Sequence, residues 1–139
     1  MPQGSLGVSA SALSAQRTRL NVIAENIANV NTTRAEGGGA YKRRVVSLES
    51  EAPKFSALLP GEPQLRGVKI GGIEQMQETR KIHMPGHPDA DADGMVEMPN
   101  VNPVMEMADM MMATRAYEAN VSAIQALKSM TQKALELGR

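Results

Sequence analysis

The stretch SLGVSASALSAQRTRLNVIAENIANVN, residues 5–31, carries an apolar side chain at every seventh position. Ile23 and Val30 occupy the intermediate positions of the same repeat, and Gln16 is its polar exception. The heptad positions are Leu6, Leu13, Leu20 and Ile27. An a/d pattern over about three heptads is typical of a helix that pairs with another helix. The sequence therefore predicts a helix from about Ser5 to Asn31, ended by the polar and glycine-rich residues 31–39.

A second long helix is predicted from Val104 to about Leu137, a stretch without proline or glycine. Pro103, just before it, suits the first turn of a helix. The apolar positions mostly recur every three or four residues, with one longer step between Met111 and Tyr117. They are Met107, Met111, Tyr117, Val121, Ile124, Leu127, Met130, Ala134 and Leu137. The stripes of the two helices could pair as an antiparallel or folded-back coiled coil.

The residues between the helices change from a helical period to strand-like alternation. Residues 41–48 and 67–76 are predicted strands, the second broken by a bulge at Gly71-Gly72. Residues 49–66 are predicted to form a loop, and the proline-rich residues 83–103 an extended or turning arm. The fold class expected is mainly α with a small antiparallel β insert. Residues 1–33 and 104–139 form the paired helices, and residues 34–103 form the β insert and the arm.

The composition predicts a soft core and a marginal monomer. Aromatic residues make up only 2% of the 139 residues, whereas methionine occurs 11 times. Methionine side chains are flexible and fill irregular gaps, so burial against other copies or partners would help such a chain. Cysteine is absent, which excludes disulfides, thiol chemistry and the sulfur ligands that zinc prefers.

The charges balance overall but are unevenly placed. Fifteen basic and fifteen acidic residues give a net charge of zero, which argues against a nucleic-acid binder. Residues 1–44 hold six basic and two acidic residues, net +4, and residues 89–109 hold six acidic and no basic residues, net −6. This asymmetry either sets contacts between neighbouring subunits or marks two solvated faces.

The sequence shows no signature of a cleavable signal peptide, a membrane-spanning segment or an enzyme. No basic segment followed by an apolar run marks a cleavable signal peptide, and no apolar run is long enough for membrane insertion. No phosphate loop or nucleophile motif accompanies the strands, so we expect neither an enzyme nor a cofactor site. Export from the cytosol would then use a route without a cleaved signal peptide.

The segment Asp89-Ala90-Asp91-Ala92-Asp93-Gly94 resembles half of an EF-hand calcium loop. Position 12 of such a loop would be Asn100 rather than a bidentate glutamate, and Pro85 and Pro88 prevent an entering helix. We therefore expect a turn and no metal site. The alternative is a calcium-responsive helix-binding module that uses Asp89, Asp91 and Asp93 with the methionine cluster at residues 105–112.

That methionine cluster and a group of asparagines are the remaining candidates. Five methionines within residues 105–112 cannot all lie on one stripe, so we expect some to be covered by a partner or by the β insert. Asn26, Asn29 and Asn31 lie near the end of the first helix. Asparagine there caps or bonds locally, but its amide can also bond across an interface.

Both ends of the chain resemble a known family. Residues 12–33, ALSAQRTRLNVIAENIANVNTT, followed by Tyr41, resemble the N-terminal signature of the flagellar rod and hook proteins. Residues 86–130, which contain the His-Pro-Asp-Ala-Asp segment and end in RAYEANVSAIQALKSM after residue 114, are most similar to the proximal rod members of that family. The short length is also similar to theirs.

This resemblance implies a structural subunit of the bacterial flagellar basal-body proximal rod, self-assembling helically and transmitting motor torque. It implies passage through the flagellar type III export apparatus to the periplasm, and partners that are other rod subunits and further copies. Neither nucleic acid nor direct membrane insertion is implied. The assembly interface is expected at Leu13, Leu20, Ile23, Asn26, Ile27, Asn29, Val30, Met107, Met111, Tyr117, Asn120, Val121, Ile124, Leu127 and Met130.

Overall fold

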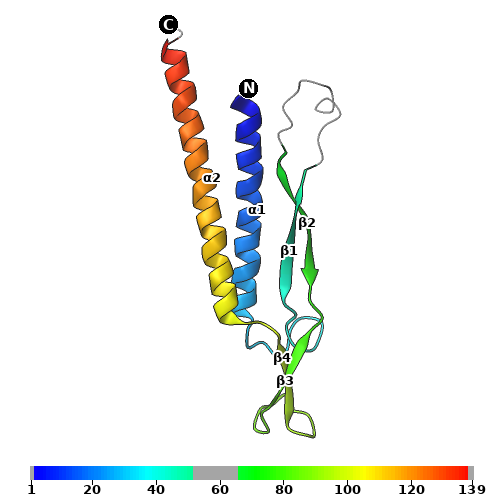
Figure 1. Cartoon of the computed structure of the whole chain (residues 1–139). Helices are drawn as coiled ribbons and strands as arrows, with labels where there is room; N and C mark the ends of the chain where they lie inside the picture. The colour runs from blue at the N-terminus through cyan, green and yellow to red at the C-terminus, as the bar shows by residue number, and fades with distance from the viewer. Residues whose placement is uncertain (1, 52–65, 138–139) are drawn as a thin grey trace.

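Two long antiparallel helices lie side by side along the molecule (Figure 1). The computed structural model describes residues 2–51 and 66–137. Helix α1 spans Pro2–Ala28 and helix α2 spans Pro103–Leu137. With 27 and 35 residues, they are about 40 and 52 Å long at 1.5 Å per residue. The C-terminal end of α2 consequently runs past the start of α1.

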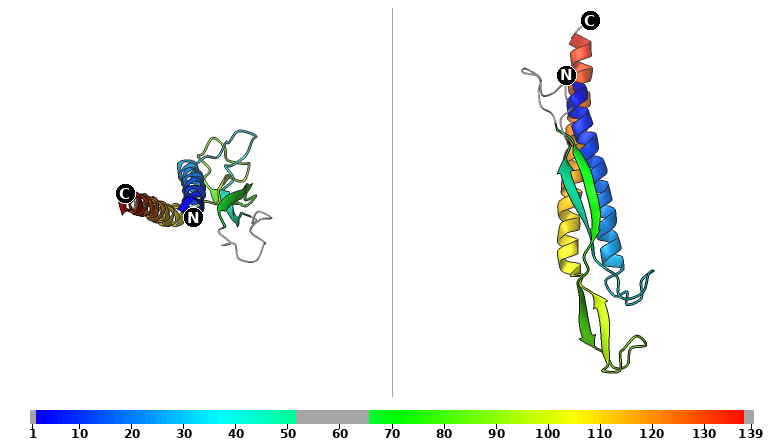
Figure 2. Two further views of the ribbon diagram at one scale, coloured as in Figure 1. Left: turned by 90° about the horizontal axis from the view of Figure 1, so that it is seen from above. Right: turned by 90° about the vertical axis from the view of Figure 1, so that its right-hand side faces the viewer.

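Two small antiparallel sheets form the β insert. Strand β1 (Arg44–Ser50) pairs with β2 (Val68–Gln75), and β3 (Thr79–His83) pairs with β4 (Met95–Pro99). Helix α1 packs against α2 on one side and against β1 and β2 on another, so that it forms the middle of the molecule (Figure 2). The β3–β4 hairpin projects beyond the end of the helix pair. The predicted fold class is confirmed.

The first helix begins and ends about three residues earlier than predicted. The helix ends just after Asn29, where the backbone N–H of Val30 donates to Ile27 O at 3.4 Å instead of continuing the i−4 pattern. The side chain of Asn29 bonds on both sides of this point. Its Nδ2 donates to Glu25 O at 2.9 Å, and its Oδ1 accepts from Thr32 Oγ1 at 3.1 Å. Val30, expected on the helical stripe, therefore lies in the turn that follows α1.

The strands differ from the prediction at their ends. Residues 41–43 precede β1 because the backbone N–H of Tyr41 donates to Thr32 O at 3.0 Å, and β1 continues to Ser50. The predicted bulge is confirmed, since Ser47 pairs with Gly72 and Leu48 with Ile70, which leaves Gly71 unpaired. The loop expected over residues 49–66 lies mostly outside the described residues. Neither β3 nor β4 was predicted as a strand, and the expected arm over residues 83–103 contains the turn and the second strand of the β3–β4 hairpin.

The buried core is small and divided. One part lies along the helices and contains Ala15, Val22, Ile23 and Ala113. The other part lies where the insert meets the helices and contains Ala40, Tyr41, Val96, Met98 and Val101. The chain exposes 9894 Å², against about 7,000 Å² expected for a compact monomer of this mass. The shape is thus one that leaves much surface for contacts with other molecules.

Candidate assembly site

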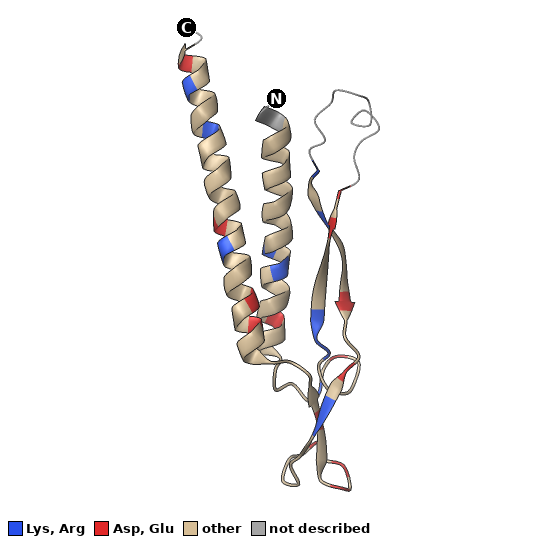
Figure 3. Ribbon diagram, in the orientation of Figure 1, with Lys and Arg blue, Asp and Glu red and all other residues tan. Residues whose placement is uncertain are grey.

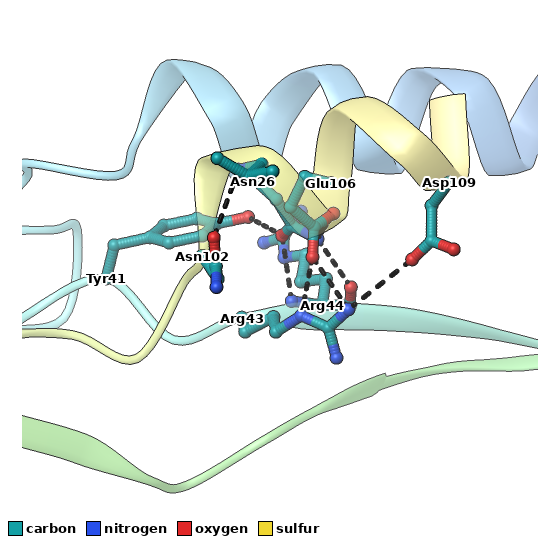
Figure 4. Close-up of polar contacts among 8 residues, drawn as sticks. Asn26, Tyr41, Arg43, Arg44, Asn102, Glu106 and Asp109 are labelled. Atoms are coloured by element: carbon teal, nitrogen blue, oxygen red, sulfur yellow. Dashed lines mark hydrogen bonds and ion pairs between the residues drawn. The ribbon is translucent and has the colours of Figure 1, made fainter. Parts of the chain in front are cut away.

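A buried cluster of polar side chains joins the end of α1, the start of β1 and the first turn of α2 (Figure 4). We call Asn26, Tyr41, Arg43, Arg44 and Glu106 the polar junction. Asn26 and Glu106 are each only 1% exposed, although they are polar or charged. Burying such groups is costly unless they are hydrogen-bonded, so the bonds within this cluster determine whether the three elements stay together.

The side-chain amide of Asn26 is fully bonded. Its Nδ2 donates to Arg44 O at 2.8 Å and to Glu106 Oε2 at 3.1 Å. Its Oδ1 accepts from Arg44 N at 3.0 Å and from Tyr41 Oη at 3.0 Å. Two donors and two acceptor sites are all that an amide offers. Toward Arg44, Asn26 bonds to both backbone groups as a neighbouring strand would, which anchors β1 to α1.

The Glu106 carboxylate fixes α2 to the same point. Arg43 Nε donates to Oε1 at 2.7 Å, and Arg43 Nη2 lies 2.6 Å from the same oxygen. Asp109, one turn later, lies 4.0 Å from Arg43 Nη2. Asn102 Oδ1 accepts from Val104 N at 3.0 Å and so caps the first turn of α2, which is the turn that carries Glu106. Pro103 occupies the first turn, as predicted.

Part of the uneven charge distribution is thus used within the chain. Arg43 meets Glu106, and Arg34 pairs with Asp89. In Figure 3 the acidic and basic residues of the two helices are sparse, and none lies in the N-terminal half of the described part of α1.

Tyr41 is the remaining member of the polar junction, and its hydroxyl donates to Asn26 Oδ1. Burial raises the pKa of the Tyr41 hydroxyl above its ordinary value, and Arg44 opposes this while Glu25 and Glu106 reinforce it. The hydroxyl therefore stays protonated and donates to Asn26 over the whole neutral range.

The Asp89–Gly94 segment forms the turn of the β3–β4 hairpin. Gly94 adopts a φ of 71°, and its N–H donates to Asp91 O at 2.8 Å. Asp89 accepts from Thr33 Oγ1 at 2.8 Å and pairs with Arg34, and the bond from Thr33 is the main cause that lowers the pKa of Asp89. The expected turn is confirmed, and Asp89 fastens the hairpin to the loop after α1.

Within residues 2–51 and 66–137, no three His, Asp or Glu side chains come together as metal ligands. None of the helices in the described part of the chain has the length and hydropathy needed to cross a membrane.

The side of α2 that faces α1 differs from the predicted stripe in its first half. The buried and half-buried positions recur every three or four residues and include Glu106, Met110, Ala113, Tyr117, Asn120, Ile124 and Leu127. Met107, Met111 and Met130 are instead 53%, 61% and 67% exposed. The expectation that these three lie on the stripe that pairs with α1 was wrong. Met107 and Met111 are displaced because the buried Glu106 holds the first core position, whereas Met130, in the second half of α2, lies about 120° around the helix from the side that faces α1. The long step between Met111 and Tyr117 was the signal of this error.

On α1, the predicted stripe is used within the chain. Ile23 is 5% exposed, and Leu13, Leu20 and Ile27 are half-buried. On α2, Tyr117, Asn120, Val121, Ile124 and Leu127 are half-buried, and Asn120 Nδ2 bonds to Ala116 O at 2.8 Å. Asn26 lies in the polar junction, and Asn29 bonds locally. The exposed candidates for contacts with other subunits are therefore the methionines of α2.

Sequence reasoning missed the roles of Glu106, Arg43 and Arg44. The long step between Met111 and Tyr117 indicated that the methionines and the later stripe lie on different sides of α2, but it did not point to Glu106. No local pattern indicated that the strand-like Arg43 would meet it, because their contact spans 63 positions of the chain.

An elongated fold with paired terminal helices, a polar junction and a helix surface left uncovered defines a structural component of a larger assembly. Two family models match the chain: "Flagella basal body rod protein" over residues 6–35 and "Flagellar basal body rod FlgEFG protein C-terminal" over residues 92–137.

Similar curated proteins cover nearly the whole chain. Flagellar basal-body rod protein FlgC of Bacillus subtilis is 44% identical, with 97% of each chain covered. FlgC of Borreliella burgdorferi is 40% identical over 96% of this chain and 95% of its own, and FlgC of Salmonella typhimurium is 39% identical over 95% and 94%. The chain belongs to the FlgC family of flagellar basal-body rod proteins, which are structural subunits and not enzymes.

Proposed function

We propose that this rod subunit assembles through the surface of α2 that its own fold leaves uncovered. Its partners are further copies of itself and other rod proteins, and the resulting proximal rod transmits motor torque. The observation that carries the proposal is the exposure of large apolar side chains on one helix. Val104, Met105, Met107, Met111 and Met112 are between 53% and 73% exposed. Large apolar side chains exposed together on one helix mark interaction sites in soluble proteins.

The two parts of the chain have different places in this proposal. Residues 1–33 and 104–139 form the axial core, and residues 34–103 lie outside it. Three features support the division: the helices pair along their length, they carry few charges, and the polar junction fixes the insert at one side (Figure 3). Three members of the predicted interface are exposed, and we assign them to contacts between subunits: Met107, Met111 and Met130.

We further propose that the chain passes unfolded through the flagellar export apparatus and acts in the periplasmic part of the rod. The small, divided core supports this route, because little burial has to be lost before export.

The test places two charges on the uncovered surface. Met107→Glu with Met111→Glu alters only exposed side chains, so the helical circular dichroism of the purified chain should be unchanged. In cells, the variant should be exported but lost from purified basal bodies, with loss of motility.

The matched control is Ser122→Glu with Gln125→Glu, which adds the same charge to exposed polar positions of α2. It should leave motility and incorporation close to the wild-type level. Normal amounts of the methionine variant in basal bodies would contradict the proposal.

A further inference from the structure

Exposed methionine side chains are concentrated on α2. Residues 2–51 and 66–137 contain ten methionines, of which seven are exposed. Five of these seven lie on α2: Met105, Met107, Met111, Met112 and Met130. The first four lie within about two turns of the helix, and we call them the methionine surface. They make up most of the exposed apolar surface that the proposed function assigns to contacts between subunits.

The methionines that the fold itself uses are shielded. Met98 is 8% exposed, in the part of the core where the insert meets the helices. Met110 is half-buried on the side of α2 that faces α1, although it directly precedes the exposed Met111. A reagent in solution therefore reaches the methionine surface far more readily than the methionines that pack inside the fold.

The thioether group of methionine reacts with hydroperoxides. The sulfur lone pair attacks one peroxide oxygen, the O–O bond breaks, and a sulfur–oxygen bond forms. With hydrogen peroxide, the second oxygen leaves as water. The sulfur gives up an electron pair and becomes a sulfoxide, and the peroxide is reduced. Cysteine, the other side chain whose sulfur such an oxidant attacks, is absent from the chain.

The effect of a sulfoxide depends on where the side chain has to lie. Oxidation converts a flexible apolar side chain into a polar one, which disrupts methionine-rich interfaces. On the free subunit, the methionine surface stays in water, so the new oxygen is hydrated and the packing of α1 against α2 is unchanged. In a contact between subunits, the same oxygen would be buried without a hydrogen-bond donor, and this is unfavourable.

We propose that the methionine surface is a modification site, at which oxidation by a hydroperoxide leaves the subunit folded but unable to assemble. This inference rests on the proposed function and adds to it the chemistry that blocks the contact. The separation of the two effects follows from burial, since the exposed methionines serve the contact and Met98 and Met110 serve the fold.

Treatment of the purified full chain with hydrogen peroxide tests the selectivity of the reaction. Peptide mass spectrometry measures the addition of oxygen at each methionine, and circular dichroism measures the helix content. The methionine surface should be oxidised at least tenfold faster than Met98, with the helical signal unchanged. Equal rates at the two places, or loss of helix while the methionine surface is oxidised, would overturn the inference.

The effect on assembly is tested by sorting oxidised subunits in cells. Cells without methionine sulfoxide reductases make this chain first, receive a brief treatment with hydrogen peroxide, and make the other rod proteins only after the peroxide is removed. The sulfoxide fraction at the methionine surface should be at least fivefold lower in purified basal bodies than in the subunits left unassembled. Met84, which is 39% exposed in the β3–β4 hairpin, is the internal control and should show the same fraction in both pools.

Equal sulfoxide fractions at the methionine surface in the two pools would overturn the inference. Equal depletion at Met84 would also overturn it, because oxidised chains would then be rejected regardless of the site of oxidation. Failure of the proposed function has a different sign: untreated chains with Met107→Glu and Met111→Glu would appear in basal bodies in normal amounts.

Discussion

Asn26→Asp is the substitution that tests the polar junction most severely, because it changes one atom of a buried side chain. The aspartate keeps an oxygen that can accept from Arg44 N and Tyr41 Oη, but it loses both donated bonds. Those bonds reach Arg44 O at 2.8 Å and Glu106 Oε2 at 3.1 Å. The change also places a second carboxylate beside Glu106, in a position that is 1% exposed.

The expected loss of stability has two parts. Leaving a buried acceptor without its donor costs about 1–3 kcal/mol, and two acceptors are affected. Two unit charges about 4 Å apart repel by roughly 4 kcal/mol at an effective dielectric constant of 20. Arg43 offsets part of this repulsion. A total of about 4–6 kcal/mol would consume most of the stability of a small domain.

Urea denaturation of the full chain, followed by circular dichroism, measures this loss. Adding Glu106→Gln to Asn26→Asp replaces a carboxylate by an amide that can donate to Asp, so the double variant should recover at least about 2 kcal/mol. An Asn26→Asp protein within about 1 kcal/mol of wild type at pH 7 would refute the role given to this amide.

Three further predictions follow from the contacts around the junction and the hairpin. Tyr41→Phe should cost about 1 kcal/mol by removing the bond to Asn26. Since the pKa of Tyr41 is raised on folding, the wild type should also lose stability as the pH rises above 10, and the variant should lose less. Because the pKa of Asp89 is lowered on folding, its contribution is present above the ordinary aspartate pKa and is lost as the pH falls through the lowered value. Asp89→Asn should therefore be less stable than wild type at pH 7 but equal to it in strong acid, as measured by thermal unfolding. Calorimetric titration with millimolar Ca²⁺ should show no saturable heat, whereas a micromolar site abolished by Asp93→Ala would contradict the assignment of this segment as a turn.

The parts of the fold that could be predicted from the sequence are those that local chemistry determines. The heptad repeat of α1, the absence of proline and glycine in α2, and the unpaired Gly71 all act within a few residues of one another. The helix ends were less predictable, because the switch of the Val30 N–H from the i−4 carbonyl to Ile27 O has no clear sequence signal.

The functional surface was harder to predict because burial depends on distant residues. From the sequence, Glu106 would be expected at the surface. It is buried because it bonds to Arg43 and Asn26, which are 63 and 80 positions away in the chain. Once Glu106 holds the core position, Met107 and Met111 must lie on the exposed side of α2. The sequence predicted that some methionines would need a partner, but it could not tell which ones.

An electron-microscopy reconstruction of basal bodies that contain this chain tests the central claim most directly. We expect the Asn26–Glu106 contact to persist within each subunit, and the exposed methionines of α2 to be covered by neighbouring subunits. Helices α1 and α2 should lie in the axial core, with the β1–β2 and β3–β4 hairpins outside. Density in which Met105, Met107, Met111 and Met112 contact no other subunit, or in which the hairpins form the core, would contradict it.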